Sequence, residues 1–255
     1  MRCWAVVAGL GCACGVRASP VAPAGWGGSV PGESPVKLTI EALTHSYAAA
    51  PSPRAAVAVR RLVVESGSRL CLVGRSGSGK TTLLNILCGV LVPSSGRVQL
   101  DGTDLFALGE AARDALRARS IGCIFQTFNL LEGLSAFENL TLAQRFAGVS
   151  ASAARRRADE LLELLGLRAR AAARPSELSV GEQQRVAIAR AVSKSPTLVL
   201  ADEPTASLDD ENAALVIDLL LQTSAQSTLL VATHDARLIQ RFPSATNMAE
   251  LSVVG

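Results

Sequence analysis

The sequence predicts an α/β fold with a parallel sheet as its core and an inserted helical subdomain. Hydrophobic residues make up 49% of the 255 residues, but aromatic residues only 4%. This composition, with its many alanines, favours helix-rich α/β packing over an all-β fold. Short apolar strands also alternate with helical patterns near both ends of the chain, and the middle is mostly helical. Alternating strands and helices are typical of a parallel sheet.

Strand and helix patterns place the elements one by one. In the amino-terminal part we expect strands over 36–40, 57–64, 69–73 and 96–100 and a helix over 80–88. In the remainder we expect a mostly helical block over 105–175, notably 151–165, then a strand over 197–201, a helix over 212–222 and a last strand over 227–232. The domains that follow are a leader (1–35), one folded domain (36–240, with its helical subdomain at about 105–175) and a short tail (241–255). We assign no function to 236–255.

The leader contains an apolar stretch over 3–16 that is shorter than the ~20 residues needed to span a membrane as a helix. A signal peptide, a membrane-surface anchor and a start codon placed too far upstream would each account for it. We favour a non-structural leader, because secretion would separate the nucleotide site described below from its nucleotide. No other stretch resembles a membrane span.

Charge and cysteine content exclude other classes. The net charge of +3 is too mild to indicate nucleic-acid binding. We interpret the run 155–157, three arginines, as a solvated helix face. Cys71, Cys88 and Cys123 stand singly in apolar or mixed stretches, as small buried residues do, and Cys12 and Cys14 lack zinc-ligand spacing. The six cysteines therefore indicate a reducing compartment.

One segment has the pattern of a phosphate-binding loop. The residues Gly74-Arg75-Ser76-Gly77-Ser78-Gly79-Lys80-Thr81 match G-x-x-x-x-G-K-[ST] in every fixed position, after an apolar strand and before a helix. Glycines let backbone N–H groups approach phosphate oxygens, and the helix dipole favours anions. We expect Lys80 to reach the β and γ phosphates, Thr81 to offer its hydroxyl to Mg²⁺, and Thr82 to lie near the α phosphate. The alternative is a glycine-rich turn.

A pair of acids ends the apolar strand expected over 197–201. Asp202 is the candidate for holding Mg²⁺ through its water shell, and Glu203 for polarising the water that attacks the γ phosphate. A strand-end acid pair is more often part of a solvated loop, but the phosphate loop upstream favours the catalytic interpretation. The sequence thus predicts an ATP hydrolase with ATP and Mg²⁺ as its ligands.

Further segments resemble the ATP-binding subunits of ABC transporters. They are the signature Leu178-Ser179-Val180-Gly181-Glu182-Gln183-Gln184-Arg185, the joined Walker B and D-loop Asp202-Glu203-Pro204-Thr205-Ala206-Ser207-Leu208-Asp209, the Q-loop Gln126, and His234 in Ala232-Thr233-His234-Asp235. The resemblance covers about 36–238. It implies a P-loop NTPase core with a parallel sheet, an N-terminal antiparallel β part and the inserted helical subdomain.

The resemblance also implies roles for residues outside the loop and the acids. Gln126 would sense Mg²⁺ and the water, and His234 would contact the γ phosphate; a surface glutamine and a structural histidine are the alternatives. Tyr47 would stack on adenine, with core packing as the alternative. The cofactor-binding set is then Tyr47, Gly74, Arg75, Ser76, Gly77, Ser78, Gly79, Lys80, Thr81, Thr82, Ser179, Gly181 and Glu182. Glu203, His234 and Gln126 form the catalytic set, and Thr81, Gln126 and Asp202 the metal set.

The signature is also a helix start in its own right. Ser179 and Glu182 have the spacing of a capping box. By resemblance, Ser179 and Gly181 would donate to the γ phosphate held by a second subunit. Val180 departs from the family, in which this position is usually glycine. Its β-branched side chain adds bulk and stiffens the backbone, so we expect activity to be retained but slower.

The implied partners are a second ATPase subunit, as a homodimer or a pair, and a transmembrane permease, with no nucleic acid. The protein would be peripheral, on the cytoplasmic face of the inner or plasma membrane. Segments 125–131 and 136–140 resemble the lipoprotein-release, macrolide-export and cell-division branch. A soluble ABC ATPase is the rival, but the interval from Lys80 to Ser179 is too short for the coiled coil of repair ATPases. A hydrolysis-impaired regulatory subunit is the third interpretation, which Val180 leaves open.

Overall fold

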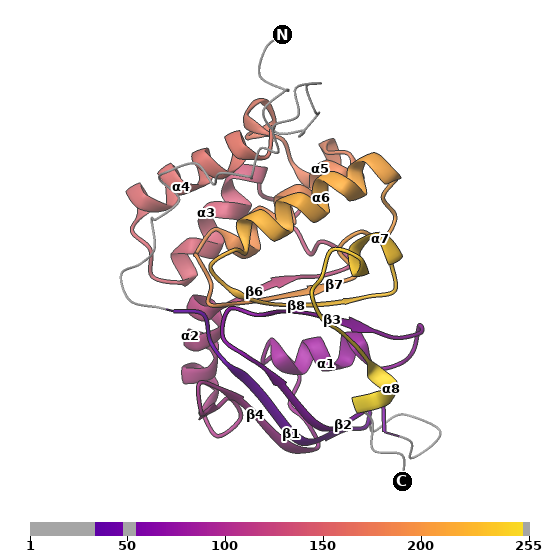
Figure 1. The fold of residues 1–255 in the computed structure, drawn as a ribbon. Helices are drawn as coiled ribbons and strands as arrows, with labels where there is room; N and C mark the ends of the chain where they lie inside the picture. The colour runs from indigo at the N-terminus through magenta and orange to yellow at the C-terminus, as the bar shows by residue number, and fades with distance from the viewer. Residues whose placement is uncertain (1–33, 48–54, 252–255) are drawn as a thin grey trace. The chain divides into compact units, whose positions relative to one another are not determined.

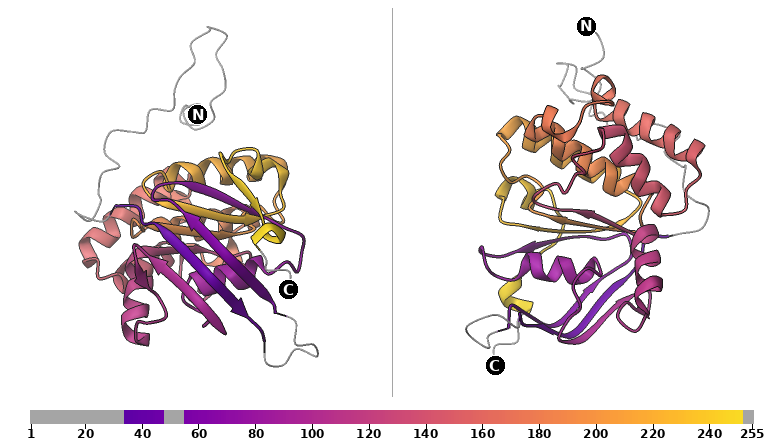
Figure 2. Two further views of the ribbon diagram at one scale, coloured as in Figure 1. Left: turned by 60° about the horizontal axis from the view of Figure 1, so that its bottom comes forward. Right: turned by 180° about the vertical axis from the view of Figure 1, so that it is seen from behind.

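A parallel sheet lies at the centre of the fold in the computed structural model, which describes residues 34–47 and 55–251. Helices from the second half of the chain cover one face of this sheet, and helix α1 (Lys80–Leu87) covers the other (Figure 1). An antiparallel sheet lies beyond α1, which is therefore enclosed between two sheets (Figure 2). The predicted α/β class is confirmed.

The parallel sheet has the strand order β6-β7-β8-β3-β9, and every neighbouring pair is parallel. Its strands are β6 (Ile121–Ile124), β7 (Leu198–Asp202), β8 (Thr228–Thr233), β3 (Arg69–Val73) and β9 (Ala245–Asn247). Because parallel strands end at the same edge, the segments that follow β3, β6, β7 and β8 meet there. These segments carry the phosphate loop, Gln126, Glu203 and His234.

The antiparallel sheet has the order β2-β1-β4-β5. Its strands are β1 (Leu38–His45), β2 (Val57–Val64), β4 (Ser95–Leu100) and β5 (Thr103–Asp104). The expected strand over 57–64 is confirmed, whereas the expected strand over 36–40 covers only the start of β1. A register shift between Glu41 and Thr44, with Ala42 at a φ of 48°, breaks the alternation of buried side chains. The second half of β1, with the sequence EALTH, is more polar than the first and forms a strand by pairing with β2 and β4.

Two hydrophobic cores lie on the two faces of the parallel sheet. Alternate residues of β7 divide between them: Leu198 and Leu200 pack toward α1 and the antiparallel sheet, and Val199 and Ala201 pack toward the other helices. Those helices include α3 (Ala136–Phe146), α4 (Ala151–Leu164), α5 (Val180–Val192) and α6 (Asp210–Thr223), with 3₁₀ turns at Arg168–Arg170 and Pro175–Glu177. Helix α2 (Glu110–Ser120) packs its Leu116 against the core on the α1 side. A strand buried on both faces is expected to be apolar throughout, as β7 is.

The block over 105–175, which its pattern predicts to be mostly helical, also contains a strand. Strand β6 falls inside it and extends the parallel sheet. A four-residue apolar run cannot be assigned by periodicity alone, because a buried strand and a buried helical turn look the same. Gly122 lets β6 approach α5 closely, since a Cβ there would lie 2.6 Å from the carbonyl oxygen of Ala191.

The carboxyl-terminal segment forms α7 (Ala236–Ile239), β9 and α8 (Met248–Leu251). Strand β9 pairs with β3 beside the phosphate loop, and Met248 and Leu251 are buried in the core. The part of the tail over 241–251, to which the sequence assigns no function, thus belongs to the folded domain. The leader prediction, including Cys12 and Cys14, lies outside the described residues except for 34 and 35.

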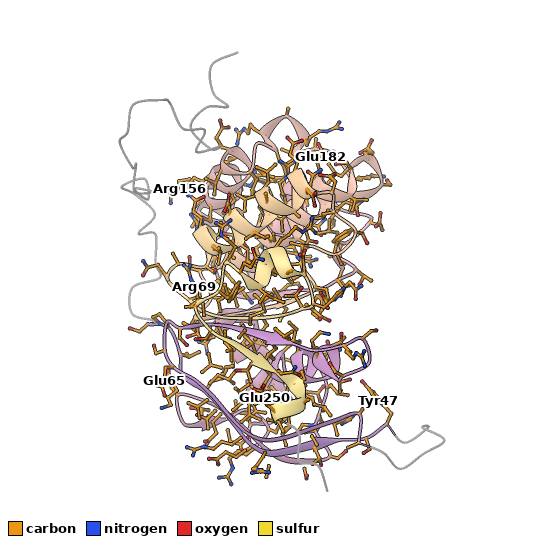
Figure 3. All side chains as sticks on the ribbon, turned by 45° about the vertical axis from the view of Figure 1, so that its right-hand side comes forward. Tyr47, Glu65, Arg69, Arg156, Glu182 and Glu250 are labelled. Atoms are coloured by element: carbon orange, nitrogen blue, oxygen red, sulfur yellow. The ribbon has the colours of Figure 1, made fainter. Side chains whose placement is uncertain are left out.

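Cysteine and arginine positions follow the sequence interpretation. Cys71 and Cys88 are buried, and Cys123 is half-buried against the same core. Burial raises the pKa of Cys71 to about 11, so this thiol stays neutral. Arg156 is exposed on α4 (Figure 3), as expected for a solvated helix face. Within 34–47 and 55–251, no helix combines the length and apolar character that crossing a membrane requires.

Candidate functional site

The phosphate loop connects the end of β3 to the start of α1. Lys80 begins the helix and is 6% exposed. Its Nζ donates to the carbonyl oxygens of Gly74 (2.6 Å) and Arg75 (3.3 Å). The loop therefore curls around the ammonium group, whose positive charge faces the hollow that the loop encloses.

Gly79, the residue before α1, satisfies two separate requirements. Its φ of 88° lies in the left-handed region, which favours glycine. A Cβ at this position would also lie 2.5 Å from the carbonyl oxygen of Ala56. No side chain caps α1, so the first N–H groups of the helix are available to an anion.

Two buried polar atoms beside the loop lack partners of their own. Ser78 Oγ, inside the loop, and Asp202 Oδ1, at the end of β7, make no hydrogen bond. The Thr81 hydroxyl hydrogen-bonds to Asp202, whose pKa is raised chiefly by burial. A buried carboxylate with a free oxygen beside a hydroxyl is a set of hard oxygen donors, which fits Mg²⁺.

Glu203 follows Asp202, and hydrogen-bond donors surround its carboxylate. Its Oε1 lies 2.7 Å from His234 Nδ1 and 3.5 Å from Lys80 Nζ. Its Oε2 accepts from the Thr233 hydroxyl at 2.8 Å. The backbone of Glu203 has a φ of 45°, uncommon for a residue with a side chain, and such conformations cluster at functional sites.

An open cavity of about 300 Å³ lies over these groups. It is lined by Ala56, Ser76, Gly77, Ser78, Gly79, Lys80, Thr81, Thr82, Gln126, Glu203 and His234. The structure thus brings together the predicted loop, the Q-loop glutamine, the second acid and the histidine from four segments of the chain. Gly74, Arg75 and Asp202 lie behind the lining, in contact with Lys80 and Thr81.

Tyr47 lies beside the cavity and is 49% exposed, which argues against core packing. Its hydroxyl is 3.2 Å from the Thr82 Oγ1, and its ring makes an edge contact with His45, with centroids 4.9 Å apart. His45 is itself buried, and its ring stands at 86° to the ring of the tyrosine. Adenine stacking by Tyr47 stays a prediction.

The signature opens α5 as a reciprocal capping box, as the sequence predicts. The Glu182 N–H donates to Ser179 Oγ, and Glu182 Oε2 accepts from the Ser179 N–H at 2.8 Å. Glu182 Oε1 also accepts from Arg170 Nε at 3.3 Å. The Ser179 N–H lowers the pKa of Glu182, with Arg170 adding to the effect. The Glu182 carboxylate thus stabilises its own helix start.

Gly181 and Val180 have opposite environments. A Cβ on Gly181 would lie 2.7 Å from Asn212 Oδ1, so a larger residue there would require the Asn212 side chain of α6 to move. Val180 is the first residue of α5, and 46% of it is exposed. The valine therefore fits the helix of its own chain, and its bulk faces outward from the signature.

The signature residues do not line the cavity of their own chain. Figure 3 shows Tyr47 beside the antiparallel sheet and Glu182 at the opposite side of the parallel sheet. Ser179, Gly181 and Glu182 are therefore separated from the phosphate loop within one chain.

Three residues contribute to the site although the sequence alone does not identify them as site residues. Ala56 precedes β2 and has no chemical signal in the sequence. The sequence places Thr233 only in the segment of His234. Its hydroxyl, directly before that histidine, is the signal that could identify it as a site residue. Asp235 donates its N–H to Thr233 Oγ1 at 3.0 Å and belongs to the same network.

Comparison with known proteins agrees with this geometry. Residues 60–206 match the family model described as ABC transporter. The chain is 44% identical to the lipoprotein-releasing system ATP-binding protein LolD of Pseudomonas syringae pv. tomato, over 80% of this chain and 91% of that protein. It is 42% identical to LolD of Chromohalobacter salexigens, over 80% of this chain and 86% of that protein.

A solved structure has the same fold. The dimeric post-hydrolysis structure of the ATP-binding cassette MJ0796, bound to ADP and Pi, superposes with a TM-score of 0.78 at 32% identity and covers 86% of this chain and 97% of that one. The chain therefore belongs to the ABC transporter family, as one of its ATP-hydrolysing subunits.

Proposed function

We propose that this chain hydrolyses ATP in a nucleotide sandwich formed with a second ATPase subunit, and that it powers a separate membrane permease. The observation that carries this proposal is the meeting of Lys80, Glu203 and His234 at one cavity with the phosphate loop. The signature, which lies outside that cavity, supports a site completed by a second chain.

Each phosphate of ATP has candidate donors in the structure. The backbone of 74–79 and the Ser78 hydroxyl surround the β and γ phosphates, and Lys80 supplies the positive charge. Because Lys80 Nζ already lies near Glu203, a bound γ phosphate would compete with that carboxylate for the ammonium. Thr82 lies by the α phosphate, and Tyr47, which contacts Thr82, by adenine.

Asp202, Thr81 and Gln126 are the residues that would hold Mg²⁺ in this proposal. The free Oδ1 of Asp202 and its hydrogen bond to Thr81 support the assignment. Bound Mg²⁺ neutralises charge on the β and γ phosphates. Gln126 approaches from the end of β6, on the other side of β7 from the phosphate loop.

Glu203 accepts a proton from the attacking water in the proposed reaction. The Thr233 hydroxyl and the His234 ring hold its two oxygens, which fixes the direction of the carboxylate. His234 is 72% exposed at its side chain, so it can turn from Glu203 toward the γ phosphate. Positioned general bases contribute ~10²–10⁴-fold to such reactions.

The partner ATPase would complete the site with Ser179 and Gly181. The amino terminus of α5 presents free N–H groups and a partial positive charge, which suit a γ phosphate. The solved MJ0796 cassette is dimeric, which supports this pairing. Val180, exposed at the same helix start, would lie at the subunit interface.

The permease would contact the helical block that follows Gln126. Phe146, the last residue of α3, is 72% exposed, and Leu131, between Gln126 and α3, is 48% exposed. Aromatic residues are enriched at protein interfaces, so the exposed Phe146 supports a contact here. The resulting complex would place this chain at the cytoplasmic face of the membrane as a peripheral subunit.

The cargo we propose is a lipoprotein or another envelope component. The support is the identity of 44% to a protein named for lipoprotein release, over 91% of its length. The intact Lys80, Asp202, Glu203 and His234 favour an active subunit over a hydrolysis-impaired one.

Removing Mg²⁺ tests the hydrolytic site. We expect EDTA to stop phosphate release from ATP, while a fluorescent ATP analogue still binds, since Lys80 and the loop N–H groups contact phosphate without the metal. Phosphate release and fluorescence anisotropy of the purified chain measure the two effects. Undiminished hydrolysis in excess EDTA would contradict the metal assignment of Asp202 and Thr81.

Substituting Phe146 tests the permease surface. We expect Phe146→Ser to lower co-purification with the permease and permease-stimulated turnover, because an exposed aromatic anchor is lost, and to leave the turnover of the isolated chain unchanged. Arg156→Ser, an exposed change on α4, is the matched control. Equal co-purification of the two variants would place the permease contact elsewhere.

A further inference from the structure

Arg237, in the segment after the histidine, bridges two catalytic loops. We propose that Arg237 is a positioning residue for hydrolysis: it clamps Asp235, beside His234, to the D-loop that follows Glu203. This inference rests on the proposed roles of Glu203 and His234. It adds a residue and a connection that those roles do not contain.

The first part of the clamp is a carboxylate enclosed by donors. Asp235 Oδ1 accepts from the Arg237 N–H (2.9 Å) and Nε (3.0 Å), and Oδ2 accepts from Arg237 Nη2 (2.8 Å). Thr205 Oγ1, from the D-loop, donates to the same Oδ2 at 2.6 Å. These donors, Arg237 first, hold the pKa of Asp235 at about 2. Asp235 is therefore charged throughout the physiological range.

The second part reaches the start of α6. Arg237 Nη1 donates to Asp210, the first residue of that helix. One guanidinium thus joins the loop after β8 to the loop after β7 at two separate carboxylates. A planar, forked donor can do this, whereas a lysine ammonium presents a single point of charge.

Hydrogen bonds also connect Asp235 to the proposed catalytic groups. The Asp235 N–H donates to Thr233 Oγ1 (3.0 Å), whose hydroxyl donates to Glu203 Oε2 (2.8 Å). His234, between these two residues, contacts the other oxygen of Glu203. A shift of Asp235 would therefore move both the proposed base and the histidine.

The backbone of the D-loop segment shows why a clamp is needed. Glu203 and Ser207 have φ values of 45° and 66°, and Thr205, between them, is only 2% exposed. Conformations of this kind persist only where surrounding contacts fix them. Thr205, through Asp235 and Arg237, is such a contact.

The chain contains a matched comparison for Arg237. Arg241 Nη2 pairs with Asp218 of α6 at 2.5 Å, and both side chains are about half exposed. This pair joins the same two parts of the chain, but it has one hydrogen bond and no link to Asp235 or Thr205. Exposed ion pairs of this kind, to which Arg237 with the 96% exposed Asp210 also belongs, contribute little to stability by themselves.

We expect Arg237→Ala to lower kcat for ATP about 10-fold or more, with the KM for ATP changed less than about 3-fold, because misplaced catalytic groups cost rate more than binding. Arg237→Lys is expected to restore kcat only in part, and Arg241→Ala to leave it unchanged. Thermal melts of all three variants verify folding. A kcat for Arg237→Ala equal to that of Arg241→Ala would overturn the proposal.

Two further measurements keep the test decisive. If Arg237→Ala does not fold, Arg237→Lys decides, since wild-type kcat in that variant would overturn the clamp. Glu203→Gln is assayed in parallel. An inactive Glu203→Gln with a fully active Arg237→Ala would overturn this inference alone, whereas an active Glu203→Gln would overturn the proposed function on which it rests.

Discussion

Replacing Glu203 by glutamine is expected to lower ATP turnover ~10²–10⁴-fold, the usual contribution of a positioned general base. Glutamine keeps the shape of the side chain and can still accept from Thr233, but its amide cannot take a proton from water. ATP binding should persist, because Lys80 and the phosphate loop are unchanged. Single-turnover phosphate release and nucleotide-binding titrations measure the two effects.

The control is Glu250→Gln, a change of the same kind on the exposed surface of α8 (Figure 3). Its turnover should equal that of the unmodified chain. The ATP-bound Glu203→Gln chain should also accumulate as a dimer, because hydrolysis no longer opens the sandwich. Turnover in Glu203→Gln that matches Glu250→Gln would remove Glu203 as the base.

The second large effect is expected for Lys80→Met, which should weaken ATP binding about 10- to 100-fold. A hydrogen bond to a charged group contributes ~1.5–3 kcal/mol, which corresponds to that range. Methionine fills the buried space of Lys80 without its charge, and so the loop should keep its backbone course. Isothermal titration with ATP measures the change.

Lys37→Met is the matched control, because Lys37 makes an exposed ion pair with Glu65 and neither residue lines the cavity. Its affinity for ATP should be unchanged. An ATP affinity of Lys80→Met within twofold of this control would show that the ammonium does not bind phosphate, and would leave Lys80 as a structural residue of the loop.

The strands and helices with unbroken patterns could be predicted from the sequence. The strands over 57–64 and 69–73 have the bounds of β2 and β3: each is rich in valine and leucine, although β2 carries Arg60 and Arg61 at its centre. β6 could not be found in this way, because its role as a strand depends on pairing with β7. β9 is similar: three residues form a strand because β3 offers a free edge.

The sequence predicts which residues form the site better than it predicts the contacts between them. A phosphate loop is a local motif, so the sequence contains all of its residues from Gly74 to Thr81. Glu203 could be named from the acid pair that ends the strand, and His234 by resemblance, but their 2.7 Å contact depends on β7 and β8 being neighbours. The role of Arg237 could not be predicted, because this arginine belongs to no sequence motif.

Mixing two defective chains tests the sandwich most directly. One chain carries Lys80→Met, and the other carries Ser179→Arg, which places a large side chain at the signature. In a sandwich, the mixed dimer has one site with both defects and one site with none. Each variant alone should then be nearly inactive, and an equal mixture should regain about a quarter of wild-type turnover, since half of the dimers are mixed and each has one intact site. A mixture no more active than the mean of its two parents would contradict a site shared between chains.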